Sequence, residues 1–178
     1  MKRSYLKDAR VPQIRPWVRF FARSLDLFLW NVVCWTSLRI VVLGSAQAAS
    51  LLSSLVFGIA FSFSWIFIEA LLLSSVGSTP GKWLLKVTLR RKDGTVLPRS
   101  QALARSFQVW WQGQAGNVPG MNLVAELLAY QSLRSDSITA WDRRCDTIVI
   151  HGEIGPVRAI SAAGCFVILF FLGIAVGV

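Results

Sequence analysis

The sequence is poor in the residues that build disulfide frameworks and metal sites. Of its 178 residues, three are cysteine and one is histidine. Cys34, Cys145 and Cys165 are odd in number and far apart, which argues against a disulfide framework and against a zinc site. The single histidine, His151, has no glutamate at the spacing of a zinc protease. We therefore expect neither a bound metal nor a cofactor.

Acidic residues are also scarce, whereas apolar residues are abundant. Aspartate and glutamate number 9 against 19 lysines and arginines, charged residues make up 16% of the chain, and 54% of it is hydrophobic. A nucleic-acid-binding protein would carry its basic residues on a polar surface, so nucleic acid is not an expected partner. An apolar and basic chain instead predicts a membrane protein with cationic loops.

Two segments have the length and composition of a transmembrane helix. Residues 46–75 contain one charged residue, Glu69, and residues 159–178 contain none. A third candidate, residues 17–43, is more polar. Its charged residues are Arg19, Arg23, Asp26 and Arg39. We still expect it to span the membrane, because the short segment 44–50 leaves the second helix no partner except an antiparallel first one.

Basic residues gather in two parts of the chain and predict its orientation. Residues 1–23 hold seven and residues 77–105 hold another seven, whereas residues 44–50 hold none. By the positive-inside rule, the N-terminus and the 77–105 segment lie in the cytoplasm. We therefore expect a multi-pass protein of the cell (inner) membrane with a cytoplasmic N-terminus.

The cytoplasmic segment contains a β-hairpin signal. Residues 86–91 alternate in polarity, Asp93-Gly94 supplies a tight turn, and residues 96–97 begin a return strand. Far downstream, residues 146–150 form another short, β-branched run. Because a lone hairpin is only marginally stable in water, we expect this third run to pair with it, which places residues 146–150 in the cytoplasm as well.

The middle of the chain, residues 101–133, is too polar for a simple lipid-facing span. Two stretches, 101–111 and 121–130, flank a break at residues 113–120, and glutamines, asparagines and Glu126 are spread through the segment. We expect a helix-break-helix hairpin at the cytoplasmic leaflet. The expected fold is thus a mainly α-helical membrane protein: three transmembrane helices, an interfacial or re-entrant helical hairpin and a small cytoplasmic β-hairpin or sheet, with the C-terminus outside.

No arrangement typical of an enzyme is visible. Gly77-Ser-Thr-Pro-Gly-Lys82 suggests a phosphate-binding loop, but only three residues separate Gly77 from Gly81, and Trp83 stands where that motif needs serine or threonine. We interpret the segment as a cytoplasmic turn motif, made of Thr79, Pro80, Gly81 and Lys82. Serine and cysteine residues lack a nearby base, so we expect no catalysis.

Charged residues of the first helix share one face. Arg19, Arg23 and Asp26 are spaced i, i+4 and i+7. A charge inside the hydrocarbon costs at least ~2.5–3.5 kcal/mol on insertion scales, so it normally faces other helices and has a partner. Depth along the two helices predicts an Arg23–Glu69 pair. The alternative is that the two arginines extend to lipid headgroups while Asp26 hydrogen-bonds within the bundle.

The ordered set of motifs resembles the RDD family of bacterial membrane proteins, which is named for one arginine and two aspartates. The motifs are Arg19-Phe-Phe-Ala-Arg-Ser-Leu-Asp26, Gly77-Ser-Thr-Pro-Gly-Lys82, Asp93-Gly94, Arg105, and Thr139-Ala-Trp-Asp142 ahead of Thr147-Ile-Val-Ile. The resemblance covers about residues 15–152. It implies that the name residues are Arg19, Asp26 and Asp142, and it adds Asp142 to the expected intramembrane polar cluster of Arg19, Arg23, Asp26 and Glu69.

Two positions depart from the family pattern. Ser78 stands where the family often has glutamine, and Trp141 stands where a histidine commonly precedes the second aspartate, so a proton relay through that histidine does not transfer. The predicted organisation is a basic cytoplasmic arm (1–16), an RDD-like membrane domain (17–152) and a C-terminal transmembrane helix (153–178).

Two functional hypotheses follow. The resemblance implies transport, which has been suggested for the family, and a charged group inside the membrane often marks an ion pathway. Transport of ions or small solutes through the polar cluster would need an oligomer, since three crossings cannot enclose a pathway. The alternative is a non-enzymatic scaffold or accessory subunit. Its cationic face would bind lipid headgroups or a protein partner, at ~1 kcal/mol per basic residue, through Arg90, Arg91 and Lys92.

Overall fold

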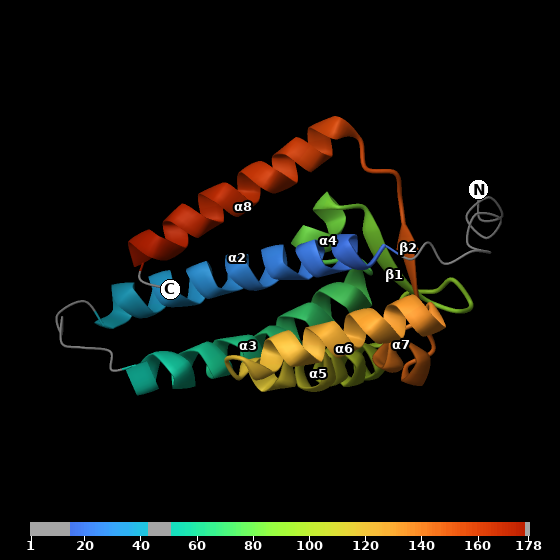
Figure 1. Ribbon diagram of the computed structural model, residues 1–178, viewed down its shortest axis with the longest axis horizontal. Coiled ribbons are helices and arrows are strands. Elements are labelled where there is room, and N and C mark those ends of the chain that lie inside the picture. The colour runs from blue at the N-terminus through green and yellow to red at the C-terminus, as the bar shows by residue number, and fades with distance from the viewer. Residues whose placement is uncertain (1–14, 43–50, 177–178) are drawn as a thin grey trace.

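Three long helices form the body of the molecule. The computed structural model describes residues 15–42 and 51–176. Helices α2 (Pro16–Val42), α3 (Leu51–Ser75) and α8 (Pro156–Val176) run lengthwise through it, as Figure 1 shows. They correspond to the three long helices expected from the sequence. Residue 43 of the first expected helix, residues 46–50 of the second and residues 177–178 of the third lie outside the described residues.

Two of these helices are long and apolar enough to cross a membrane. Within the described residues, the segments that meet this condition are Leu55–Ser75 of α3 and Pro156–Ala175 of α8. Helix α2 is longer, with 27 residues, which is about 40 Å at the rise of an α-helix. It is not one of the two, and it carries four charged residues along its length.

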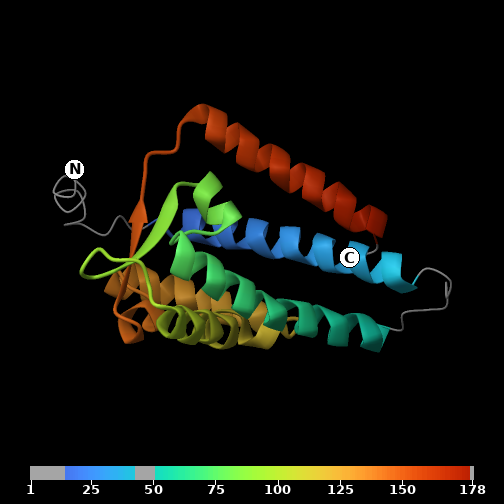
Figure 2. The ribbon, with the colours of Figure 1, turned by 180° about the vertical axis from the view of Figure 1, so that it is seen from behind.

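The middle of the chain forms the expected helical hairpin. Helix α5 (Arg99–Gln114) is followed by the short 3₁₀ helix η1 (Ala115–Asn117) and by α6 (Met121–Asp136). All three residues of η1 have positive φ, between 49° and 66°, and this reverses the chain. The hairpin lies against the half of α3 that is nearer the strands (Figure 2).

A two-stranded antiparallel sheet joins distant parts of the chain. Strand β1 (Val87–Arg91) pairs with β2 (Thr147–His151), with Val87 opposite His151 and Arg91 opposite Thr147. The expected pairing of the downstream run with the first strand is therefore confirmed.

The prediction of a β-hairpin, in contrast, is wrong. Asp93 and Gly94 do turn the chain, and the Arg91 amide donates to the Thr95 carbonyl oxygen at 2.9 Å. Residues 96–97 form no strand, because Pro98 follows at once and is the N-cap residue of α5. Leu97 instead buries its side chain in the core, where it is 1% exposed.

The order of elements occurs twice. In each half, two long helices lead to a helix of five residues and then to a strand: α2, α3, α4 (Pro80–Leu84) and β1 in the first half, and α5, α6, α7 (Ala140–Arg144) and β2 in the second. Each short helix follows a threonine and is separated from its strand by two residues. The second of these has positive φ: Lys86 (51°) in the first half and Asp146 (49°) in the second. The antiparallel strands connect the two halves.

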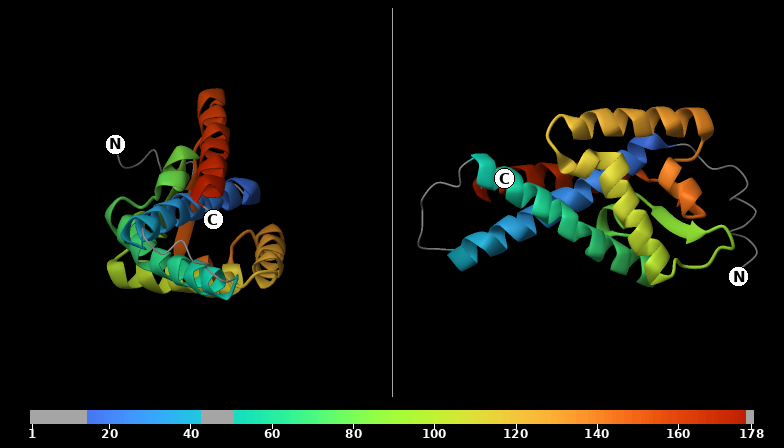
Figure 3. Two further views of the ribbon diagram at one scale, coloured as in Figure 1. Left: turned by 90° about the vertical axis from the view of Figure 1, so that its left-hand side faces the viewer. Right: turned by 90° about the horizontal axis from the view of Figure 1, so that it is seen from below.

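The strands and short helices mark one end of the molecule. Both strands and both short helices gather at one end, which we call the strand end (Figures 1 and 2). Helix α2 lies between α8 and the group formed by α3, α5 and α6 (Figure 3). The core fills the strand end where these elements meet. Its residues include Ala22, Leu25, Leu73, Leu85, Val87, Leu89, Leu97 and Val149.

Candidate functional site

Asp26 of α2 is buried beneath the first short helix. Its side chain accepts hydrogen bonds from the Thr79 hydroxyl and from the Gly81 amide, the latter at 2.6 Å. Glycine permits this contact, since a Cβ at position 81 would lie 2.2 Å from the carbonyl oxygen of Ala22. The segment expected to be a simple turn is therefore a short helix packed directly on α2. Hydrogen bonding within the bundle was the alternative expected for Asp26, and the structure shows it.

Glu69 of α3 is paired with a residue of the same short helix. Lys82 is 8% exposed, and its Nζ lies 2.6 Å from Oε1 of Glu69 and 3.9 Å from Oδ2 of Asp26. The predicted Arg23–Glu69 pair is wrong. Arg23 donates from Nη2 to Oε1 of Gln114 at 3.2 Å. The prediction compared depths along two helices and did not anticipate that α4 and α5 supply closer partners.

Asp142, the third residue of α7, accepts hydrogen bonds from both halves of the molecule. Arg19 approaches Oδ2 at 3.0 Å, and Arg105 approaches Oδ1 at 2.8 Å through Nη2. The hydroxyls of Thr139 and Thr147 donate to it at 2.7 and 3.0 Å. Burial by itself would raise the pKa of Asp142, but Arg105, Arg19 and the Thr139 hydroxyl outweigh it and hold the pKa below its ordinary value. The carboxylate is therefore ionised at neutral pH.

Arg19 has a second acceptor, His151, which the sequence did not single out for this role. Arg19 Nε donates to His151 Nε2 at 3.3 Å. Burial, together with Arg19 and Arg15, lowers the pKa of His151 to about 4, so its ring is neutral and can accept a hydrogen bond.

Trp141 packs against Gly113, where a Cβ would lie 3.2 Å from its ring. At the position where the resemblance implies a histidine, this chain thus has a tryptophan that packs against α5.

The two halves contribute opposite charges at corresponding places. Lys82 and Asp142 are each the third residue of their short helix. Lys82 approaches an acid of α2, Asp26, whereas Asp142 binds a base of α5, Arg105. No spacing signal in the sequence reveals these partners, because they come from elements far apart along the chain.

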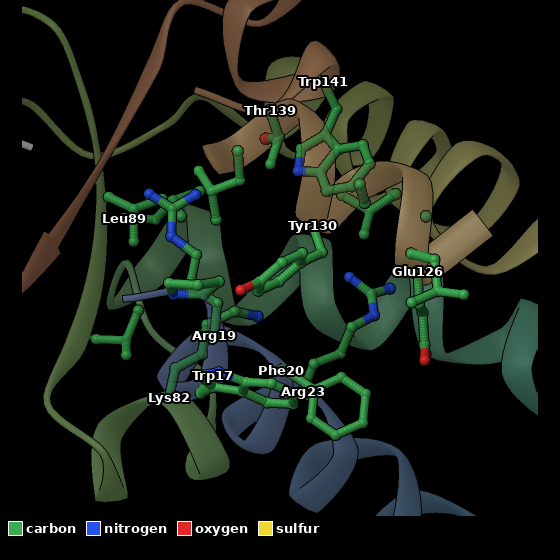
Figure 4. Close-up of a pocket in the computed structure, with 18 of the residues that line it drawn as sticks. Trp17, Arg19, Phe20, Arg23, Lys82, Leu89, Glu126, Tyr130, Thr139 and Trp141 are labelled. Carbon is green, nitrogen blue, oxygen red and sulfur yellow. The ribbon is translucent and has the colours of Figure 1, made fainter. Parts of the chain in front are cut away.

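A cavity of about 430 Å³ lies beside the charged residues, between α2, α5 and α6. Figure 4 shows Trp17, Phe20 and Arg23 of α2 across it from Thr139 and Trp141. The basic residues that line the cavity are Arg19, Arg23, Lys82 and Arg105, and the acidic one is Glu126. Most other lining residues are aliphatic or aromatic.

Two N–H groups of the lining arginines have no hydrogen-bond partner. Among the described residues, these buried donors are Nε of Arg23 and Nη1 of Arg105. Burial raises the pKa of Glu126, an effect that Arg23 opposes. The four lining cations face four acidic residues: the fully buried Asp26, Glu69 and Asp142, and Glu126. An anionic group that reaches Arg23 and Arg105 would satisfy both donors.

The basic residues expected to contact lipid or a partner lie away from this cluster. Arg90 donates to the carbonyl oxygens of Leu89 and Val76, at 2.9 and 3.2 Å. At the end of β1, Arg91 and Lys92 form exposed ion pairs with Asp93 and Asp146, at 3.3 and 2.5 Å. Pairs of this exposed kind contribute little to stability.

Comparison with known proteins gives one match. A family model, that of the RDD family, matches residues 15–177. The match is longer than the resemblance read from the motifs, since it extends through α8. No curated protein and no solved structure is significantly similar to the chain.

Proposed function

The chain belongs to the RDD family and is a membrane protein of that type; from this we propose that it transports a small anionic solute through the cavity at the strand end. The observation that carries the proposal is the lining of that cavity. Four basic side chains reach it, and two of them keep a buried N–H group without a partner among the described residues.

The charges of the site balance, so the support for an anion as the ligand comes from the unpartnered donors of the site and not from an excess of positive charge. Asp26, Glu69 and Asp142 have basic neighbours within 4.0 Å, provided by Lys82, Arg19 and Arg105. Arg23 contacts an uncharged amide instead. The carboxylates of Glu69, Asp26 and Glu126 also act on the charge of Arg23. What favours an anion next to Arg23 is its buried Nε, which has no hydrogen-bond partner among the described residues.

Membrane topology is part of the proposal. We assign α2, α3 and α8 as three spans of the inner membrane, with the strand end and the N-terminus in the cytoplasm. The basic residues of 77–105 support this orientation. Helices α5 and α6 have 16 residues each, about 24 Å, which is short of the ~30 Å hydrocarbon layer. Since β1 and β2 are paired, the α5–α6 hairpin enters and leaves on one side.

The repeated element order favours transport over a purely structural role. Transporters are often built from two repeats, with the substrate site at the interface between them. Here the cavity is lined by Arg19, Arg23 and Lys82 of the first half and by Arg105 and Glu126 of the second. Three spans do not enclose a complete pathway, so we propose that the protein works as an oligomer.

Uptake into vesicles tests this function. The purified protein, reconstituted into liposomes, is offered inorganic phosphate, acetate and a fluorescent short-chain acidic lipid. We expect movement of at least one of these anions above that in empty liposomes, with about a tenfold loss in Arg23→Gln. Arg134→Gln is the matched control, because Arg134 is exposed on α6 and does not line the cavity. No movement of any anion, or equal rates in both variants, contradicts the proposal.

A scaffold role is the second candidate. It is favoured by the exposed basic residues of the strand end, among them Lys86, Arg99, Arg143 and Arg144. Under this alternative, neutralising Arg90, Arg91 and Lys92 together lowers the amount of acidic lipid or partner protein that copurifies. An unchanged amount removes the support for a scaffold that acts through these three residues.

A further inference from the structure

The cavity has an apolar mouth on the side of the molecule. Trp17 and Phe20 of α2 and Leu123 and Leu127 of α6 line it, and each of these side chains is also exposed on the outer surface, by 39–61%. A residue that both lines a cavity and is exposed lies at its opening. The cavity therefore opens sideways, between α2 and α6, through a rim of apolar side chains.

The surface around this opening is apolar as well. Met121, Val124 and Leu128 of α6 are 57–60% exposed and turn away from the cavity. A soluble protein rarely exposes an apolar patch of this kind, whereas a helix in contact with lipid does so routinely. The mouth thus faces the hydrocarbon side of the interface and not the aqueous side.

The inner wall of the cavity carries four basic residues, Arg19, Arg23, Lys82 and Arg105, and one acidic residue, Glu126. Arg105 is 5% exposed. Its Nη1 donor and the Nε donor of Arg23 are both buried and have no hydrogen-bond partner among the described residues. Figure 4 shows Arg23 extending from α2 on the side of the cavity where Glu126 lies. A ligand that contacts both the apolar mouth and the arginines must therefore have a hydrocarbon part and an acidic group.

We propose that the cavity binds the acidic head group of a membrane lipid, which enters sideways from the bilayer between α2 and α6. This inference rests on the proposed function, because it uses the same anion site and names the class of its ligand. The phosphate oxygens accept hydrogen bonds from Arg23 and Arg105. The first part of one acyl chain lies against Phe20, Leu123 and Leu127, and the rest of the lipid stays in the bilayer.

The volume agrees with this arrangement. Ligand cavities in proteins commonly measure ~300–1,000 Å³, and about 430 Å³ accommodates a head group and the start of a chain. A zwitterionic head group of the choline type would bring its own cation towards the arginines. The site therefore discriminates between lipids by the net charge of the head group and requires the apolar chain for access.

Native mass spectrometry of the full chain in detergent tests the inference. The probes are phosphatidylglycerol, phosphatidylcholine with the same chains, and soluble glycerol phosphate. We expect phosphatidylglycerol to bind at least about tenfold more tightly than the other two, and Arg23→Gln to weaken it about tenfold. Leu127→Trp, which fills the mouth without changing a charge, weakens it as well. The matched controls, Arg134→Gln and Leu128→Trp, bind like the unaltered protein.

The outcomes separate this inference from the proposed function. Equal affinity for the two phospholipids, or equal effects of Leu127→Trp and Leu128→Trp, overturns the lipid site. Glycerol phosphate binding as tightly as phosphatidylglycerol also overturns it, because the ligand is then a soluble anion, and transport stands. Selective binding of phosphatidylglycerol that depends on Arg23, without movement of any anion in liposomes, supports the lipid site and contradicts transport.

Discussion

Two of the three buried carboxylates of the site, Asp26 and Asp142, are held by donors from a distant part of the chain. Asp26 binds groups more than 50 residues away, and Asp142 binds Arg19 across 123 residues. Removing one partner of a buried ion pair typically costs about 3–5 kcal/mol, because the other charge is left uncompensated. These residues consequently fix how the elements of the strand end pack, in addition to placing charge beside the cavity.

Gly81 is the residue whose size matters most for this packing. In Gly81→Ala the new Cβ meets the Ala22 carbonyl oxygen, so α4 must move away from α2 and the amide bond to Asp26 is lost. We expect a loss of about 1–3 kcal/mol in the free energy of unfolding, measured by denaturation in detergent. Gly164→Ala on α8 is the control, since nothing lies within 4 Å of a Cβ there. Equal stability of the two variants contradicts this account.

His151 makes the stability of the protein depend on pH. Its pKa is about 4 in the folded protein and near 6.5 when unfolded, so the unfolded chain binds the proton first as the pH falls. Stability is therefore full above about pH 6.5 and decreases towards pH 4.

His151→Gln tests this dependence on pH. Glutamine keeps an acceptor for Arg19 without titrating, so the variant should lose stability less steeply between about pH 6.5 and 4. The measurement is the denaturation midpoint in detergent across this range. Identical pH slopes for variant and parent would show that the ring does not carry the effect. Below about pH 4 protonation of Asp142 contributes separately.

At the scale of elements, the short helices and their strands follow one local design. Lys86 and Asp146 both adopt left-handed backbone conformations between helix and strand. This conformation costs an L-residue about 1–2 kcal/mol, and glycine avoids that steric cost. We expect Lys86→Gly to be at least as stable as the parent and Lys86→Val to be less stable than Lys86→Gly by about 1–2 kcal/mol. If both unfold at the same denaturant concentration, the turn is not under this constraint.

Elements with a periodic or compositional signal were predictable from the sequence. The three long helices, the helical hairpin and the pairing of the β-branched run with the first strand were all expected. The return strand at residues 96–97 was not formed, because two apolar residues before Pro98 are too few to make a strand. The bounds of the downstream strand also differ by one residue: the expected run was 146–150, whereas β2 spans Thr147–His151.

At the scale of the whole molecule, the sequence showed which charged residues lie within the long helices but not which of them contact one another. Helical rise gave the depths of Arg23 and Glu69 correctly enough to suggest a pair. Their actual partners, Gln114 and Lys82, belong to elements that return to the bundle after turns and short helices. Such contacts depend on how the elements pack in three dimensions. The position of a residue along one helix does not reveal that packing.

The central claim is that the short helices and strands of both halves of the repeat, together with the α5–α6 hairpin, lie on one side of the membrane, so that the charged residues of the two halves share one site. Single cysteines test it most directly, in a variant with Cys34, Cys145 and Cys165 replaced by serine. We predict that Lys92→Cys and Asp136→Cys react with an impermeant maleimide from the same side, and Arg39→Cys from the opposite side. Labelling of position 136 from the Arg39 side would show that the α5–α6 hairpin crosses the membrane and would contradict the account.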